Sequence, residues 1–147
     1  MEPHQHQGVD EQLNRLVGTW RPTDPSANAS TVFEVSSVAG RYGVYSVYRV
    51  PLAAGEYIAH ALWAYDRVLG KVRVFEVKST REVWYHEGSF AEDGALILER
   101  RAANDPTEVV QRGVLRWPDA DTLTMESELY GEDGSPQRAA VDFKRQL

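Results

Sequence analysis

The feature that most constrains this chain is a long series of strand-like segments joined by short connectors. From Thr19 to Gln146, segments rich in aromatic and β-branched residues alternate with clusters of turn-forming residues such as Gly131-Glu132-Asp133-Gly134. Parallel neighbours would need crossovers of about a dozen residues or more, which these connectors do not provide. The sequence therefore predicts an antiparallel, up-and-down arrangement.

About nine or ten strands are expected, more than a strongly twisted open sheet carries comfortably. Closing the sheet removes its exposed edges, so an all-β fold with a single antiparallel meander barrel is favoured. A sandwich of two sheets is the alternative that the pattern leaves open. The expected strands span residues 19–22, 31–38, 41–50, 56–66, 71–79, 81–90, 95–101, 107–117, 122–130 and 137–146.

A short helix is expected before the first strand. Val9, Leu13, Leu16 and Val17 recur at the spacing of one helical face, and Gly18 is a typical helix stop. Because a helix of this length is not stable alone, its apolar stripe should pack over one mouth of the barrel.

The chain of 147 residues is long enough for one domain with a sizeable core. Residues 1–8 are polar and are expected to form a flexible N-terminal tail, and residues 9–147 the barrel domain. The tail has neither the basic nor the apolar region of a secretory signal, so a cytoplasmic protein is expected.

Charge and composition narrow the choice of partners. A formal net charge of −6 and a pI near 5.2 argue against a phosphate backbone or an anionic membrane surface. The absence of cysteine excludes disulfides, thiolate metal sites and cysteine nucleophiles. We therefore expect no nucleic acid, no membrane, no metal and no cofactor, and we leave a homodimer open.

Alternation of apolar and polar residues indicates which side chains face the barrel interior. Leu123 and Met125 share one face of their strand while Glu126 lies on the other, and Phe143 alternates with charged residues in the last strand. The tyrosines of residues 41–50 fall on both faces, and Tyr48 is the one we expect inside. Met125 and Phe143 are expected inside as well.

The middle strands hold two histidines. If the turns at residues 67–70 and 80–81 are tight, cross-strand neighbours form two rows on one face. One row holds His60, Val77 and Trp84, and the other holds Leu62, Phe75 and His86. We expect this face to be the interior, although a slip of one residue in either turn would reverse it.

These faces predict a cavity for a small apolar or aromatic molecule. The candidate ligand-binding residues are His60, Leu62, Phe75, Trp84, His86, Tyr48, Met125 and Phe143. A small barrel enzyme (an isomerase, cyclase or hydrolase) using cavity histidines and tyrosines is an alternative, and a ligand-free structural or interaction domain is another. Two histidines alone make a weak metal site. A carboxylate pair among Glu34, Glu76 and Glu99 stays open, because their faces are not fixed.

The segment Gly18-Thr19-Trp20 after a short amphipathic stretch resembles the opening of calycin β-barrels, the lipocalin and fatty-acid-binding group. In that group a basic residue from the last strand commonly covers the tryptophan. The resemblance implies a barrel-closing cation–π pair of Trp20 and Arg145. A second interpretation, by analogy with fatty-acid-binding proteins, is that Arg145 pairs with a ligand carboxylate.

Three motifs in order, Leu13 to Trp20, Trp63-Ala64-Tyr65-Asp66 and Trp117-Pro118-Asp119-Ala120-Asp121, resemble a bacterial family of lipocalin-like proteins of unknown function. The opening also resembles haem-binding nitrobindins, whose axial histidine lies near the C-terminus. This chain has no histidine after His86, so haem is not expected.

Overall fold

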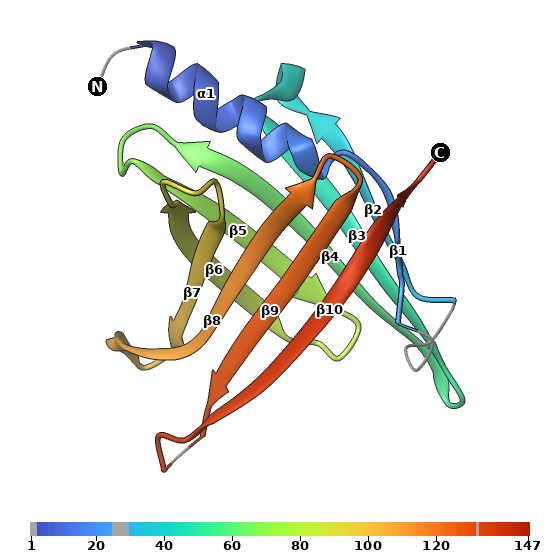
Figure 1. Ribbon diagram of the computed structural model, residues 1–147. Helices are drawn as coiled ribbons and strands as arrows, with labels where there is room; N and C mark the ends of the chain where they lie inside the picture. The colour runs from blue at the N-terminus through green and yellow to red at the C-terminus, as the bar shows by residue number, and fades with distance from the viewer. Residues whose placement is uncertain (1–2, 25–29, 132) are drawn as a thin grey trace.

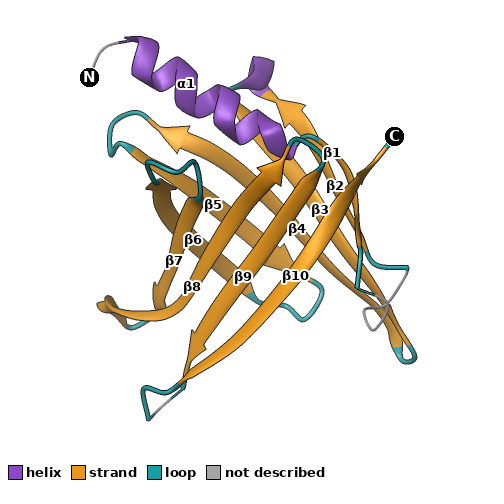
Figure 2. Cartoon of the chain, in the orientation of Figure 1, coloured by secondary structure: helices purple, strands orange, loops and turns teal. Residues whose placement is uncertain are grey.

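The computed structural model describes residues 3–24, 30–131 and 133–147. A helix at the N-terminus is followed by antiparallel strands that curl into one closed barrel (Figures 1 and 2). Within the described residues there are ten strands, each hydrogen-bonded to its neighbours in chain order, and β1 pairs with β10 to close the ring. The predicted single antiparallel meander barrel is thereby confirmed, and the sandwich is not formed.

The elements follow the expected order. They are α1 (Pro3–Leu13), a 3-10 helix η1 (Asn14–Leu16), β1 (Gly18–Pro22), β2 (Val32–Val38), a 3-10 turn η2 (Ala39–Arg41), β3 (Gly43–Leu52), β4 (Gly55–Asp66), β5 (Lys71–Lys78), β6 (Val83–Phe90), β7 (Leu96–Ala102), β8 (Asp105–Asp119), β9 (Thr122–Tyr130) and β10 (Pro136–Gln146).

The N-terminal helix lies across one end of the barrel and packs on β3 and β4 (Figure 1). It begins at Pro3 rather than near Val9, so most of the segment predicted as a tail is helical. Met1 and Glu2 lie outside the described residues, and the mobility expected of the tail stays a prediction. No helix in the described ranges has both the length and the apolar character needed to cross a membrane.

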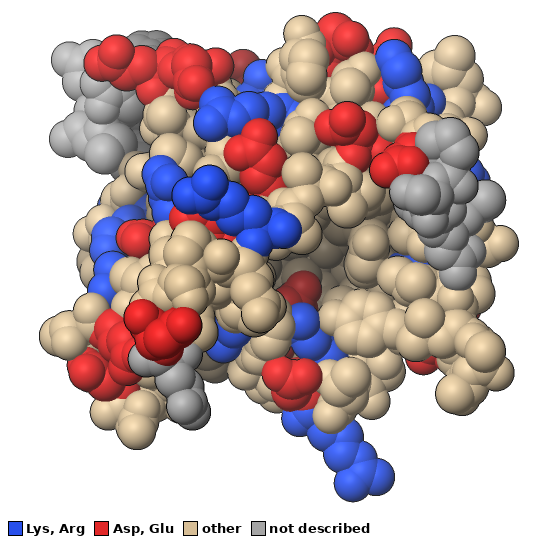
Figure 3. Space-filling view, turned by 60° about the horizontal axis from the view of Figure 1, so that its bottom comes forward, with Lys and Arg blue, Asp and Glu red and all other residues tan. Residues whose placement is uncertain are grey.

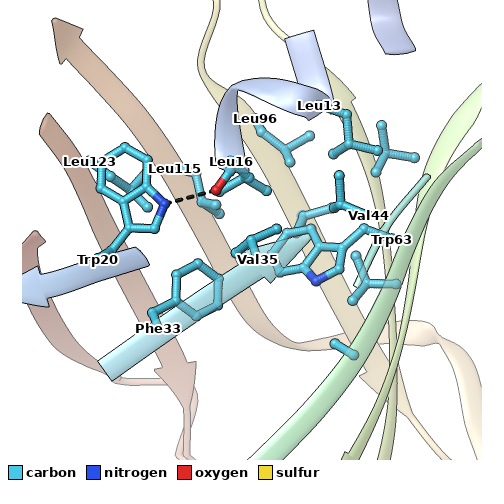
Figure 4. Packing of buried hydrophobic residues seen from close by; sticks show 14 of the residues in the cluster. Leu13, Leu16, Trp20, Phe33, Val35, Val44, Trp63, Leu96, Leu115 and Leu123 are labelled. Atoms are coloured by element: carbon cyan, nitrogen blue, oxygen red, sulfur yellow. Dashed lines mark hydrogen bonds between the residues drawn. The ribbon is translucent and has the colours of Figure 1, made fainter. Parts of the chain in front are cut away.

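The helix-covered end of the barrel holds several of the fully buried core residues. Leu13, Leu16, Trp20 and Leu123 are all fully buried there, 0% exposed. The indole Nε1 of Trp20 donates a hydrogen bond of 2.8 Å to the carbonyl oxygen of Leu16 (Figure 4). The single hydrogen-bonding group of this tryptophan is therefore satisfied where the helix meets the barrel.

The register of β4, β5 and β6 corrects the predicted interior. His60 lies opposite Val77, and Leu62 opposite Phe75, as expected. However, Val77 lies opposite Val83 instead of Trp84. The predicted face therefore breaks between β5 and β6, and in the next row Phe75 pairs with Tyr85 instead of His86.

The physical cause is the β5–β6 turn. Arg81 adopts a left-handed conformation with φ of 71°, and the N–H of Lys78 bonds to the carbonyl oxygen of Glu82. This is a three-residue hairpin loop, whereas a two-residue turn was predicted. The slip of one residue sends the two halves of the predicted row to opposite faces. His60, Leu62 and Phe75, predicted inside, lie on the outer face, where Leu62 is 51% and Phe75 39% exposed.

Candidate functional site

The barrel has a cavity of about 280 Å³, and the space-filling view shows a hollow at the end away from α1 (Figure 3). Acidic and basic side chains are visible inside this hollow. The cavity wall is mainly apolar and aromatic, with a few polar side chains. Its lining includes Phe33, Ser46, Tyr48, Tyr57, Ala59, Trp63, Val74, Glu76, Lys78, Trp84, His86, Leu98, Gln111, Leu115, Met125, Val141 and Phe143.

One side of the wall is an aromatic cluster from β2, β3 and β10. The ring centroids of Phe33, Tyr48 and Phe143 lie 6.0 to 6.3 Å apart, with tilted or edge-to-face geometry. Such contacts hold the rings in fixed positions against one another. Burial raises the pKa of the Tyr48 hydroxyl, so this group stays neutral at physiological pH. The cluster presents a rigid apolar surface to the cavity.

The opposite side of the wall carries two cations on one indole. The Lys78 Nζ lies 3.1 Å, and the Arg100 Cζ 3.8 Å, from the ring centroid of Trp84. The strands β5, β6 and β7 are neighbours in the barrel, and each supplies one of the three side chains. Both distances are within the range of a cation–π contact. Lys78 and Trp84 line the cavity, and Arg100 borders it through its contact with Trp84.

A carboxylate lies deeper along the same wall. Oε1 of Glu76 is 3.8 Å from the Lys78 Nζ and 3.5 Å from the His86 Nε2. Both separations exceed the usual length of a hydrogen bond, so the charges attract one another without a direct bond. Glu76 thus offsets part of the positive charge and leaves the ammonium hydrogens free to turn towards the cavity.

Burial shapes the protonation of this group. Loss of water contact lowers the pKa of Lys78, an effect that Glu76 and Glu82 partly oppose. Burial likewise lowers the pKa of Arg100, whose guanidinium stays charged at any physiological pH. Burial, with the nearby charges of Glu76 and Glu82, raises the pKa of Tyr57 to about 12. The cavity wall therefore combines the Lys78 cation with a neutral phenol, and Arg100 adds a second cation at its border.

The structure brings five of the eight predicted ligand-binding residues together. Tyr48, Trp84, His86, Met125 and Phe143 line the cavity, and their role in binding stays a prediction.

The other three, His60, Leu62 and Phe75, lie outside the barrel. The Nδ1 of His60 is hydrogen-bonded to the hydroxyl of Tyr45 there. Because His60 and His86 are on opposite faces of the sheet, they cannot form the proton-transfer pair considered from the sequence. In the described parts of the chain, no three or more histidine or carboxylate side chains are grouped to hold a metal ion.

Sequence reasoning missed the polar residues of the wall. Lys78 and Tyr57 of the lining and the neighbouring Arg100 were not among the predicted site residues, and the face of Glu76 was not fixed. The carboxylate pair left open is not formed, because Glu34 and Glu99 lie on the outer face while Glu76 lies inside. The signal that was available is the strict alternation of Val72, Val74, Glu76 and Lys78 along one strand.

The helix-covered end contains the contact implied by the calycin resemblance. Arg145 is paired with Trp20 in the ladder of β1 and β10, and its Cζ lies 4.3 Å from the indole centroid. Its Nη2 donates hydrogen bonds of 2.9 and 3.0 Å to the carbonyl oxygens of Arg15 and Ala120, and its Nη1 donates to that of Val17. The guanidinium therefore bonds to the protein backbone, and Arg145 is not among the residues that line the cavity.

The backbone geometry at position 18 explains why the Gly18-Thr19-Trp20 motif begins with glycine. Gly18 has φ of 141°, and a β-carbon at this position would lie 2.6 Å from the Arg145 Nη1. The backbone conformation strains any side chain here, and the arginine would have to shift to admit one. The Gly18-Thr19-Trp20 motif thus belongs to closure of the barrel end.

The outer face of β3 to β6 carries two neighbouring cross-strand rows of mainly apolar side chains. Tyr45, Leu62, Phe75 and Tyr85 form one row across the four strands, and Val47, His60, Val77 and Val83 form the other. We call these eight side chains the outer patch. Its most exposed members include Tyr85, at 61%, and Val83, at 52%. The same strands therefore carry charges inside and apolar groups outside.

Comparison with known proteins assigns the chain to a sequence family but adds no activity. The model of the DUF1579 family, described as a protein of unknown function, matches residues 5–145. A search of curated proteins finds no match.

Proposed function

Because the chain belongs to the DUF1579 family, whose description names no activity, we propose a function from the cavity itself: the protein binds a small apolar or aromatic molecule inside its barrel. The observation that carries this proposal is the cavity of about 280 Å³, open at one end and walled by aromatic side chains. Small-molecule sites are typically concave and mainly apolar, with a few placed polar groups. That this barrel is a calycin barrel is part of the same proposal.

The size of the cavity limits the ligand. Its volume of about 280 Å³ corresponds to roughly nine water-sized groups. This is near the lower limit of known ligand pockets, about 300 Å³. A ligand of one or two rings, or a short chain, therefore fits, whereas a long fatty acyl chain does not fit within the walls.

The test uses a neutral probe of matching size, 2-naphthamide, titrated into the protein by isothermal calorimetry. We expect binding with a dissociation constant below about 1 mM, equivalent to roughly 4 kcal/mol. Ala59, 4% exposed, lines the cavity, so the Ala59→Phe variant should fill it and abolish binding. Thermal unfolding of this variant shows whether the barrel remains folded. Absence of binding to the wild type, or equal binding to a folded Ala59→Phe variant, would sink the proposal.

A second candidate function, self-association, is favoured by the outer patch. Two rows of side chains across four strands cover roughly 300 Å² of sheet, given the spacing of strands and residues. A standard interface takes about 800 Å² from each partner, so the patch and its surroundings would support a weak dimer of two copies, each contributing the same face. The patch carries no Lys, Arg, Asp or Glu, which suits contact with an identical uncharged surface.

Sedimentation equilibrium over a range of concentrations tests this candidate. A monomer–dimer equilibrium that disappears in a Leu62→Lys, Phe75→Lys double variant would support it. A wild-type protein that stays monomeric up to millimolar concentration would exclude it.

A further inference from the structure

We propose that Lys78 and Arg100 form a recognition site for the acidic group of the ligand, so that the protein selects small aromatic or aliphatic monoanions over neutral molecules of the same shape. This inference rests on the proposed function and names the ligand class for the same cavity. Its basis is the pair of cations, with Nζ at 3.1 Å and Cζ at 3.8 Å from the ring centroid of Trp84.

Both cations have hydrogen-bond donors to spare. The ammonium group of Lys78 makes no hydrogen bond within the described part of the chain, and its closest carboxylate oxygen is 3.8 Å away. The Nε of Arg100 donates to the Oε1 of Gln111 at 3.0 Å, and its two terminal nitrogens have no partner in the same ranges. An ammonium offers three donors and a guanidinium a planar fork that matches a carboxylate.

The burial of Lys78 makes its free donors significant. Its side chain is only 10% exposed, yet the residue lines the cavity. A sheltered charge without a hydrogen-bonding partner is costly, and an anionic ligand would supply that partner. The lowered pKa of this lysine agrees with incomplete compensation by the protein.

The charge of the wall favours a single negative charge on the ligand. Lys78 in the lining and Arg100 at its border carry two positive charges, and Glu76 carries one negative charge. Glu126 also lines the cavity, but its carboxylate is paired with Arg116, 3.7 Å away. One positive charge is therefore left over around Trp84. Glu82 also lies near the opening, but it is exposed on the β5–β6 turn. Its carboxylate accepts hydrogen bonds from Thr80 and from the Trp84 Nε1. Water screens such an exposed charge more strongly than the sheltered ones.

The layout of the cavity gives the ligand an orientation. Lys78 of β5 lines one side of the cavity and Arg100 of β7 borders that side, whereas the cluster of Phe33, Tyr48 and Phe143 lies on β2, β3 and β10. The acidic group would meet Lys78 and Arg100, and the apolar body would lie against the aromatic cluster. The structure thus points to arylcarboxylates and short-chain carboxylates as the ligand class.

The experiment compares two probes of the same shape, 2-naphthoate and its neutral amide 2-naphthamide, by isothermal calorimetry at constant ionic strength. We expect the wild type to bind the carboxylate at least tenfold more tightly. Lys78→Met and Arg100→Met should each weaken 2-naphthoate binding fivefold or more. Each should weaken 2-naphthamide binding less, so that the preference for the carboxylate falls, and thermal unfolding shows whether the variant remains folded.

The neighbouring arginine provides the matched control. Arg101 is ion-paired with Glu99, 3.6 Å away, whereas the cations over Trp84 in the described chain are Lys78 and Arg100. Arg101→Met should therefore bind both probes as the wild type does. Equal affinity of the wild type for the two probes would overturn the anion site while leaving the cavity function in place. A selectivity that survives in both Met variants would overturn the assignment to Lys78 and Arg100. Binding of neither probe would overturn both proposals.

Discussion

Two tryptophans with an arginine over the ring lie at opposite ends of this barrel. At the helix-covered end the Arg145 Cζ is 4.3 Å from the Trp20 ring, and at the open end the Arg100 Cζ is 3.8 Å from the Trp84 ring. The surroundings differ. Arg145 donates to the carbonyl oxygens of three other residues, whereas Arg100 donates to one glutamine side chain within the described residues.

The difference shows that one contact geometry can serve two purposes. Where the guanidinium is saturated by the backbone and the indole is fully buried, the pair joins β1, β10 and the helical segment, and it contributes to stability. Where the donors are left over and the indole faces a cavity, the pair is suited to hold something else. Variants at the two ends test this division of labour.

The largest expected effect is from removing the closing tryptophan. Trp20→Ala deletes a fully buried indole and its bond to Leu16, so the free energy of unfolding should fall by about 3–5 kcal/mol. Trp84→Ala should cost less than half as much, because this ring is only partly buried. Urea unfolding of the two variants measures both changes. Equal losses would contradict the division between the ends.

The second effect concerns the motif glycine. Gly18→Ala combines a φ of 141° with a close approach to Arg145, and we expect a loss of about 2 kcal/mol or more. Gly55 is a matched control, since its φ is 131° but a β-carbon added there would meet no neighbouring atom within 4 Å. Gly55→Ala should therefore cost about 1 kcal/mol, the backbone part alone. A Gly18→Ala variant that is no less stable than Gly55→Ala would show that Arg145 simply moves aside.

A smaller effect, of opposite sign, is expected at the open end. Burial lowers the pKa of Lys78 below its ordinary value of 10.5, so the folded state resists the charge. This penalty is fully present below the folded pKa and disappears as the pH rises from there to the unfolded value. Lys78→Met should therefore match or exceed the wild type at pH 7 by up to about 1 kcal/mol. The advantage should shrink towards pH 10.

Urea unfolding at the two pH values checks this prediction. A loss of stability above about 2 kcal/mol at pH 7 would mean that Lys78 is a structural residue, because removing one partner of a needed buried ion pair is strongly destabilising.

The smallest effect is expected on the outer face. Leu62 is 51% exposed, so Leu62→Gln at low protein concentration should change the free energy of unfolding by less than about 0.5 kcal/mol. Ala61, its neighbour in the chain, is 4% exposed and faces the interior, and Ala61→Gln should be clearly destabilising. Thermal unfolding of this adjacent pair tests the corrected faces of β4 directly. A reversed order would restore the interior expected from the sequence.

The order and antiparallel direction of the strands were predictable because the lengths of the connectors determine them. Short turns between strand-like segments permit little besides an antiparallel meander, and the ten strands of the described chain follow that order. Which side chains face the interior was predictable where apolar and polar residues alternate clearly along the strand, as around Met125 and Phe143. In these strands the interior is apolar and the exterior is polar, so the pattern and the fold agree.

The candidate site was harder to predict because its strands reverse that rule. The inner face of β5 ends in Glu76 and Lys78, while its outer face shows Phe75 and Val77 to solvent. A prediction that places the apolar side chains of β5 inside therefore assigns its two faces the wrong way round. The left-handed conformation of Arg81 added the second error, since a non-glycine residue gives little sign of such a turn.

The most direct test of the account uses the four tryptophans of the chain as reporters in a single titration. Trp63 and Trp84 line the cavity, whereas Trp20 and Trp117 lie outside its lining. In ¹H–¹⁵N spectra recorded during titration with 2-naphthoate, we predict the largest shift for the indole signal of Trp84, a smaller one for Trp63, and none for Trp20 or Trp117. Shifts of Trp20 as large as that of Trp84, or saturable binding that leaves Trp84 unmoved, would contradict it.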